Sequence, residues 1–302
     1  MTVIGSRGSA LALAQSGWVR DMILSRFPGI DVAVKIIKTS ADKSPAASIR
    51  ASSSIGVFVK ELEQALVEEE IDIAVHSMKD LPTTIQPQLE IAAIPGREDA
   101  RDALIARESA GVMGLPPGAV VGTGSIRRQS QLLAMRPDLK IVDIRGNVDT
   151  RLNRLQKREY DAIILACAGL NRLGLQDRIT TPLDFSQMLP APGQGALAIE
   201  IRRQDPRTAA LVTPLNDRTA EVTVSAERMF LHAISGGCNV PAAVHARMDG
   251  AQVLIEGLVA SPDGKQIVRD SVRATTEAAV EAAASLANLI LARGGRAILD
   301  RL

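Results

Sequence analysis

The chain has 302 residues and a formal net charge of +1, and its hydrophobic content of 46% and charged content of 23% are those of a globular protein. Its length predicts about two or three domains. The small net charge provides no basic field for DNA. Aromatic residues make up only 2% of the sequence, so rings that could stack on single-stranded nucleic acid are also scarce. Two distant cysteines and three scattered histidines provide no disulfide framework and no metal site. We therefore expect a cytoplasmic monomer with no export signal, no membrane span and no nucleic-acid partner.

Strand and helix patterns alternate over the first 95 residues, as in an α/β domain. The expected elements are a strand over 2–5, a helix over 10–27, a strand over 31–38, a helix over 57–69 and a strand over 71–75. A linker follows at Pro95–Asp99, and the alternation then restarts. Its strands are expected over 102–106, 119–122, 140–144 and 160–166, with a helix after each of the last three.

A second break at Leu189–Gly195 precedes a buried strand over 196–201, which we expect to return to the first sheet. The last part has a helix over 219–234, three strands over 242–247, 252–259 and 266–273, and a helix over 277–293, with Asp-Gly hairpin turns. The predicted fold is two α/β lobes joined by a two-segment hinge, plus a small α+β C-terminal domain with an antiparallel sheet. The predicted domains are lobe 1 over 1–95 and 196–214, lobe 2 over 101–189, and the C-terminal domain over 218–302.

Arginines recur where predicted strands give way to helices. The turns contain Arg7 and Ser9; Thr123, Ser125, Arg127 and Arg128; Arg145 and Arg151; Arg172 lies in a later helix. Small residues let backbone N–H groups approach an anion there, and guanidinium groups bind carboxylate or phosphate with two hydrogen bonds. A single surface arginine more often pairs with a neighbouring carboxylate. Together, however, these arginines predict a ligand with many negative groups, whether carboxylate or phosphate.

The strand over 71–75 leads into the polar turn Ser77–Pro82, which we expect to present Lys79 and Asp80 at the mouth of a cleft between the lobes. A carboxylate among arginines stays ionised, which suits it to stabilise a cation and to accept or relay protons. Asp80 could equally hydrogen-bond its own backbone in the turn. We interpret His76 as a structural residue.

Cys238 lies in the sequence Ser235-Gly-Gly-Cys-Asn-Val-Pro241, between a predicted helix and a predicted strand. The glycines suit a helix C-cap and Val240-Pro241 favours extended backbone, so the thiol is expected to project from a short loop toward a ligand. Cys167, in contrast, lies inside an apolar run and is predicted to be a core residue. Trp18, Phe27 and Phe230 fall in helical patterns and are also expected in the core.

Five segments in register resemble the porphobilinogen deaminase family, and the resemblance extends from about residue 3 to 300. They are residues 75–82, 124–129, 145–152, 160–166 and 236–241. The resemblance implies a transferase of tetrapyrrole, or heme, biosynthesis, also called hydroxymethylbilane synthase. Such an enzyme joins four porphobilinogen molecules head to tail on a covalently bound dipyrromethane primer, releases ammonia, and hydrolyses the product to hydroxymethylbilane.

The same resemblance implies roles for individual residues. Cys238 would hold the dipyrromethane cofactor through a thioether, and Asp80 would assist departure of the amine and steady the resulting azafulvenium cation. The implied cofactor contacts are Lys79, Thr123, Ser125, Arg127, Arg128 and Arg145, and the implied substrate contacts are Arg7, Ser9, Arg151, Arg172 and Gln194. Acetate and propionate groups on every pyrrole ring make the growing chain a polyanion, which agrees with the arginine turns.

The segment over 51–58 departs from the family pattern, because it has no lysine before Phe58. We expect altered behaviour of the flap that the family forms here, with Arg50 or Lys43 as replacements for the lysine. Two other functions stay open at this point. A non-catalytic anion-binding receptor or sensor would share the periplasmic-binding-protein-like lobes but would need no thiol. A phosphate-handling transferase would use the Arg127-Arg128 turn, although the chain has no Gly-Lys-Ser/Thr phosphate motif.

Overall fold

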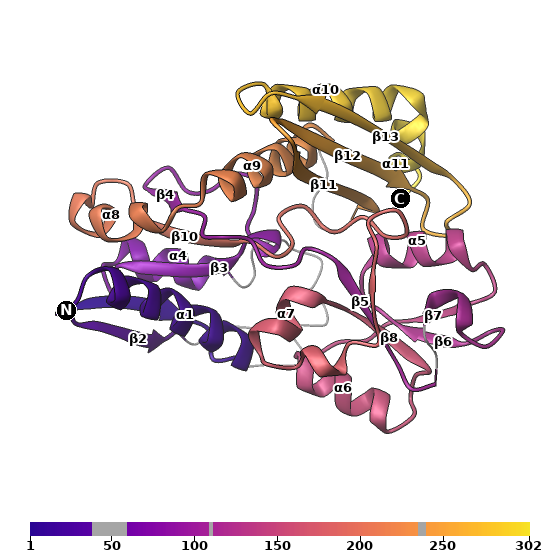
Figure 1. Ribbon diagram of the computed structural model, residues 1–302, viewed down its shortest axis with the longest axis horizontal. Coiled ribbons are helices and arrows are strands. Elements are labelled where there is room, and N and C mark those ends of the chain that lie inside the picture. Colours follow the sequence, from indigo (N-terminus) through magenta and orange to yellow (C-terminus); the bar gives the residue numbers. More distant parts are fainter. Residues whose placement is uncertain (38–58, 109–110, 235–239) are drawn as a thin grey trace. The chain divides into compact units, whose positions relative to one another are not determined.

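The computed structural model describes residues 1–37, 59–108, 111–234 and 240–302 (Figure 1). The described chain divides into two compact units, of which the first contains Met1–Glu98 and Ala196–Glu221 and the second Asp99–Gly195 and Val222–Leu302. The predictions for Cys238, Phe58, Arg50 and Lys43 lie outside the described residues. No helix in the described ranges is long and apolar enough to cross a membrane.

The first unit is built on a five-stranded sheet in the order β2-β1-β3-β10-β4. Its strands are β1 (Thr2–Ser6), β2 (Val32–Ile36), β3 (Ile73–Ser77), β4 (Leu89–Ala93) and β10 (Leu197–Arg202). β1, β2 and β3 are parallel, while β10 runs antiparallel to both β3 and β4. The prediction that the strand after Gly195 returns to the first sheet is therefore confirmed.

Helices cover both faces of this sheet. On one face, Val19 and Ile23 of α1 (Ala10–Arg26) and Val212 of α8 (Pro206–Val212) pack against apolar strand residues such as Ile73 and Ile199. On the other face, Leu62 and Leu66 of α4 (Lys60–Val67) pack against Ala74 and Leu89. The stripe containing Leu62 and Leu66 therefore forms core, as its helical spacing predicts.

The second unit contains a sheet with the same plan, in the order β7-β6-β8-β5-β9. Its strands are β5 (Asp102–Ala106), β6 (Val120–Gly122), β7 (Lys140–Val142), β8 (Ala162–Ala166) and β9 (Thr181–Leu183), with helices α5 (Ile126–Met135), α6 (Val148–Gln156) and α7 (Cys167–Arg172). β6, β7 and β8 are parallel, and β5 is antiparallel to β8 and β9. Each sheet thus has one reversed strand in the fourth position, and the chain passes from one sheet to the other before β5 and before β10.

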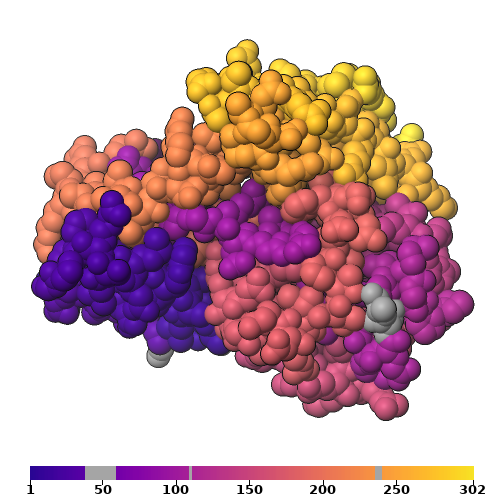
Figure 2. Space-filling view, in the orientation of Figure 1, coloured from indigo at the N-terminus to yellow at the C-terminus, as the bar shows by residue number. Residues whose placement is uncertain are grey.

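The C-terminal part of the second unit is an antiparallel meander. Its strands are β11 (Ala242–Asp249), β12 (Gln252–Ala260) and β13 (Ile267–Ala274). The helices beside them are α10 (Ala279–Ile290), α11 (Arg296–Leu299) and α9 (Arg218–Ala233), whose first turn belongs to the first unit. Phe230 of α9 and Ala283 of α10 share one core with Ile255 of β12, so both helices cover one face of the sheet (Figure 1). On the opposite face, Leu258 packs against Leu189 of the same unit. Figure 2 shows the surface of the C-terminal residues in yellow. The predicted fold class of two α/β lobes and an antiparallel α+β domain is confirmed.

Some predicted elements differ in detail. β3 begins at Ile73 rather than Ile71, and just before it the carboxylate of Asp72 accepts the backbone N–H of Val3 in place of a strand carbonyl. The C-terminal helix is interrupted near Gly294, whose φ of 118° is left-handed. The core prediction is wrong for Trp18, which is 41% exposed because the buried side of α1 contains Gln15, Ser16, Val19 and Ile23. It is confirmed for Phe230, which is fully buried.

Candidate active site

Two neighbouring parallel strands of the first unit end at the same edge of their sheet. Ile4 and Gly5 of β1 pair with Ile73 and Ala74 of β3. Arg7 therefore leaves the sheet at the same edge as Lys79 and Asp80, which follow β3 in a short 3₁₀ turn over Met78–Asp80. Asp80 is exposed, whereas Arg7 and Lys79 are half-buried. The predicted positions of these three residues after their strands are thus observed.

Helix α1 holds the end of β3 in place. Ser9 caps this helix, because its Oγ accepts a hydrogen bond from the backbone N–H of Ala12 at 3.3 Å. Further along α1, Gln15 donates its Nε2 to Ser77 Oγ at 3.0 Å. Gln15 did not figure among the predicted site residues, although a buried amide on an apolar helix face is a usable signal. It links α1 to the residue three positions before Asp80.

His76 lies on β3 with its ring buried beside Glu200 of β10. Its Nε2 and Glu200 Oε2 are 3.0 Å apart, and the two side chains are 4% and 0% exposed. A buried polar side chain is stable only when it has a partner. The structural interpretation of His76 is confirmed.

In the second unit, residues predicted to contact the cofactor or the substrate follow the ends of β6, β7 and β8. Thr123 and Ser125 follow β6, Arg145 and Arg151 follow β7, and Arg172 ends the helix after β8. Since the three strands are parallel and adjacent, these turns share one edge of the sheet. Thr123 is buried, Ser125, Arg151 and Arg172 are half-buried, and Arg145 is exposed.

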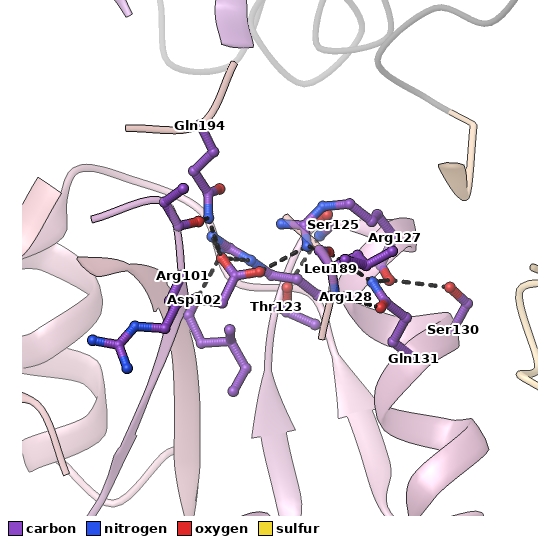
Figure 3. A network of polar contacts seen from close by, with 12 residues as sticks. Arg101, Asp102, Thr123, Ser125, Arg127, Arg128, Ser130, Gln131, Leu189 and Gln194 are labelled. Atoms are coloured by element: carbon purple, nitrogen blue, oxygen red, sulfur yellow. Dashed lines mark hydrogen bonds and ion pairs between the residues drawn. The ribbon is translucent and has the colours of Figure 1, made fainter. Parts of the chain in front are cut away.

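Arg127 and Arg128 point inward from the first turn of α5 and bind one buried carboxylate, that of Asp102 (Figure 3). Arg127 Nη1 donates to Asp102 Oδ2 at 2.7 Å and to the carbonyl oxygen of Leu189 at 2.7 Å. Arg128 donates its Nη2 and Nε to Asp102 Oδ1 at 2.7 and 3.0 Å, and its Nη1 to the carbonyl oxygen of Ile164 at 3.0 Å. Sequence reasoning missed Asp102, which is distant in the chain from both arginines.

Burial and charge oppose each other in this cluster. Burial alone would raise the pKa of Asp102, but the charges and hydrogen bonds of Arg127 and Arg128 outweigh it and hold the pKa well below its ordinary value. Burial lowers the pKa of Arg127, an effect that the charge of Asp102 opposes and that of Arg128 reinforces. Two guanidinium groups thus share a single carboxylate.

The other predicted site residues of the second unit are held by hydrogen bonds. Arg145 Nε donates to Asp143 Oδ2 at 2.7 Å, and Arg151 Nε donates to the carbonyl oxygen of Gly146 at 2.8 Å. Burial lowers the pKa of Arg151, and the neighbouring charge of Arg128 lowers it further. Arg172 Nη2 donates to the carbonyl oxygen of Gly195 at 2.7 Å. Gln194 is buried and donates its Nε2 to Asp102 Oδ1 at 2.9 Å, so it joins the same cluster as Arg127 and Arg128.

This donor set fits a ligand that carries carboxylates. Arg127, Arg128 and Arg151 bring three positive charges to one sheet edge. Asp102, the buried partner of Arg127 and Arg128, contributes one negative charge there. The hydroxyl groups of Thr123 and Ser125 add donors beside them. No cluster suited to a metal ion occurs among the residues with described positions.

Cys167 is 1% exposed in the core of the second unit, as predicted. Burial raises the pKa of its thiol to about 12. The thiolate is the reactive form, so a Cys238→Ser protein should resist thiol reagents between about pH 8 and 10 and become labelled only after denaturation. Mass spectrometry after labelling measures this, with the denatured protein as the positive control. Rapid labelling of the native variant would contradict the burial of Cys167.

Both α/β sheets have arginines after the ends of their parallel strands, an arrangement that suits anionic ligands. Residues 2–210 match the family model "Porphobilinogen deaminase, dipyromethane cofactor binding domain", and residues 221–292 match "Porphobilinogen deaminase, C-terminal domain". The porphobilinogen deaminase of Thermus thermophilus is 45% identical, with 100% of this chain and 99% of that protein covered. That of Roseiflexus sp. is 44% identical, with 98% of each chain covered, and that of Oceanobacillus iheyensis is 45% identical, with 99% and 96% covered.

The chain belongs to the porphobilinogen deaminase family. It is a transferase of tetrapyrrole biosynthesis, and its cofactor is a dipyrromethane. The family resemblance read from the five segments is therefore confirmed, and the match favours the enzyme over the receptor and the phosphate-handling transferase that the sequence left open.

Proposed function

We propose that Cys238 carries the dipyrromethane covalently and that Asp80 is the catalytic residue of porphobilinogen polymerisation to hydroxymethylbilane. The assignment of both roles rests on membership of the family, and the observation that supports binding of an anionic cofactor is the buried pair Arg127 and Arg128 with one shared carboxylate. A cation excess at the carboxyl ends of parallel strands is suited to bind the acetate and propionate groups of pyrrole rings.

The residues of the second unit would hold the cofactor by their donor groups. Arg127, Arg128 and Arg145, with Thr123 and Ser125, supply guanidinium and hydroxyl donors at one sheet edge. Lys79 in the first unit would add an ammonium group. When bound, the cofactor supplies the primer pyrrole to which substrate is added.

The substrate contacts are proposed for residues of both units. Arg7 and Ser9 lie at the start of α1, and Arg151, Arg172 and Gln194 lie in the second unit. Each guanidinium group can bind a substrate carboxylate with two hydrogen bonds. Asp80, exposed after β3, would hold a proton near the departing amine and offset positive charge there.

We also propose that the chain has three domains. The first lobe contains residues 1–95 and 196–214, the second lobe contains residues 101–189, and residues 218–302 form the third domain.

The intact mass of the purified protein tests the proposal. Wild-type protein is expected to exceed its sequence mass by one dipyrromethane, and Cys238→Ser is expected to lose this excess together with turnover. Cys167→Ser is the matched control and should keep the adduct, because Cys167 is buried in the core. An adduct that survives in Cys238→Ser would refute the attachment.

We further propose that the enzyme works as a cytoplasmic monomer without a nucleic-acid partner. The near balance of 35 basic and 34 acidic residues supports the absence of a nucleic-acid partner, because nucleic-acid binding depends on a basic surface.

A further inference from the structure

Asp102 occupies a special place at the edge of the second sheet. It is the first residue of β5, which runs antiparallel to β8, and it pairs with Ala166, the last residue of β8. A reversed strand begins where its parallel neighbours end, so Asp102 lies at the edge that bears the candidate cofactor turns. Its side chain is fully buried, and it points toward Arg128 and Gln194 (Figure 3).

Both carboxylate oxygens of Asp102 bind side chains assigned above to the cofactor or the substrate. Oδ2 accepts from Arg127, and Oδ1 accepts from Arg128 and from Gln194. Arg101, the preceding residue, points away from this cluster and pairs with Asp99 instead (Figure 3). Asp102 therefore connects three proposed ligand contacts that come from two distant parts of the chain.

Each arginine is held both by Asp102 and by a backbone carbonyl oxygen, and together these contacts orient its guanidinium group. Arg128 is held on a second side by the carbonyl oxygen of Ile164. Arg127 meets Asp102 and Leu189 through Nη1 alone, so these two partners do not engage its Nη2 and Nε. Charge-assisted bonds of this kind fix both distance and angle.

The same cluster is linked to the elements that flank residues 235–239. The backbone N–H of Gly193, next to Gln194, donates to Glu227 Oε2 at 2.7 Å. Glu227 is fully buried on α9, and its Oε1 accepts from the backbone N–H of Ala246 on β11 at 2.8 Å. Glu227 therefore ties the turn that contains Gln194 to both α9 and β11.

We propose that Asp102 is a positioning residue for cofactor attachment: it holds Arg127, Arg128 and Gln194 in the arrangement that receives the carboxylates of the dipyrromethane. It acts through these side chains and does not itself touch the cofactor. The proposal rests on the proposed function above, because it takes the arginine pair as the cofactor's binding group. Without the carboxylate, two buried like charges repel each other and lose their shared acceptor.

The test is the rate at which apoprotein acquires its cofactor. Apoprotein from cells that cannot make porphobilinogen is mixed with porphobilinogen, and the adduct is followed by intact mass. Asp102→Asn is expected to slow incorporation about tenfold or more, since it removes charge-assisted hydrogen bonds to two guanidinium groups. A purely structural role would lower Tm without slowing incorporation in the folded fraction, so both quantities are measured on the same samples.

Asp161→Asn is the matched control. Asp161 precedes β8 at the opposite edge of the same sheet, where it pairs with Arg107 at 2.9 Å and accepts from the backbone N–H of Val120 at 2.8 Å. It should incorporate cofactor at the wild-type rate. If Asp102→Asn does not fold, Asp102→Glu retains the charge while its extra methylene displaces the guanidinium groups, and it should also slow incorporation.

The outcomes separate this inference from the proposed function. Incorporation at the wild-type rate in a folded Asp102→Asn or Asp102→Glu protein overturns the inference, even when Cys238→Ser lacks the adduct as expected. An adduct that persists in Cys238→Ser overturns the proposed attachment instead. Slow incorporation in the Asp102 variants with a normal rate in Asp161→Asn supports the positioning role.

Discussion

Asp80→Asn is expected to keep the covalent cofactor and to lose nearly all turnover. The substitution preserves the shape of an exposed side chain but removes its negative charge and its ability to accept a proton. General acid–base groups contribute about 10²- to 10⁴-fold to rate, so kcat should fall by that factor. Intact mass reports the adduct, and a stopped assay of hydroxymethylbilane formation reports turnover.

Asp31→Asn provides the control for Asp80. Asp31 is also an exposed aspartate, but it precedes β2, at the opposite end of the same sheet. Its substitution should leave both adduct and kcat unchanged. Turnover near the wild-type level in Asp80→Asn would remove Asp80 from the chemistry, whereas loss of the adduct would shift its role from elongation to cofactor attachment.

Phe230→Ala should produce the largest loss of stability. Phe230 is fully buried between α9 and the C-terminal sheet, and its ring lies so close to Gly257 that a Cβ built there would be 2.4 Å from Phe230 Cε2. Removing a ring from such a core costs about 3–5 kcal/mol, because both burial and packing are lost. Urea unfolding followed by far-UV circular dichroism measures the change in the free energy of unfolding.

Phe27→Ala removes the same atoms from a half-buried position in the first unit. Its cost should be clearly smaller than that of Phe230→Ala, since the cost of truncation grows with the burial of the removed atoms. Equal losses for the two variants would mean that the C-terminal core relaxes into the space left by Phe230.

The hydrophobic periods of strands and helices differ, so the sequence predicts their alternation. It does not predict two edge strands, β4 and β9. β9 has only three residues and includes Pro182, and β4 is a five-residue strand whose sole described neighbour in the sheet, β10, lies more than a hundred residues later. Helical spacing predicts a core position for Trp18, but the buried side of α1 includes the polar residues Gln15 and Ser16. Period alone does not identify which side of a helix is buried when polar groups find partners there.

The sequence predicts some residues of the candidate site and misses others. Arginines after strands were predictable because the turn chemistry is local, and they are observed at the strand ends. Asp102 and Glu227 were not, because each appears in the sequence as an ordinary acidic residue. The reversal of β5 brings Asp102 to Arg127 and Arg128, and Glu227 accepts hydrogen bonds from Gly193 and Ala246, both distant in the chain. A carboxylate with distant partners leaves no local pattern.

The position of β10 between β3 and β4 has a consequence for synthesis on the ribosome. The N-terminal sheet lacks its fourth strand until residues 197–202 have left the exit tunnel, whereas the strands of the second sheet lie between residues 102 and 183. The sheet whose translation begins first is therefore completed after the second sheet, and until then β3 and β4 expose unpaired backbone groups to chaperones and to other nascent chains.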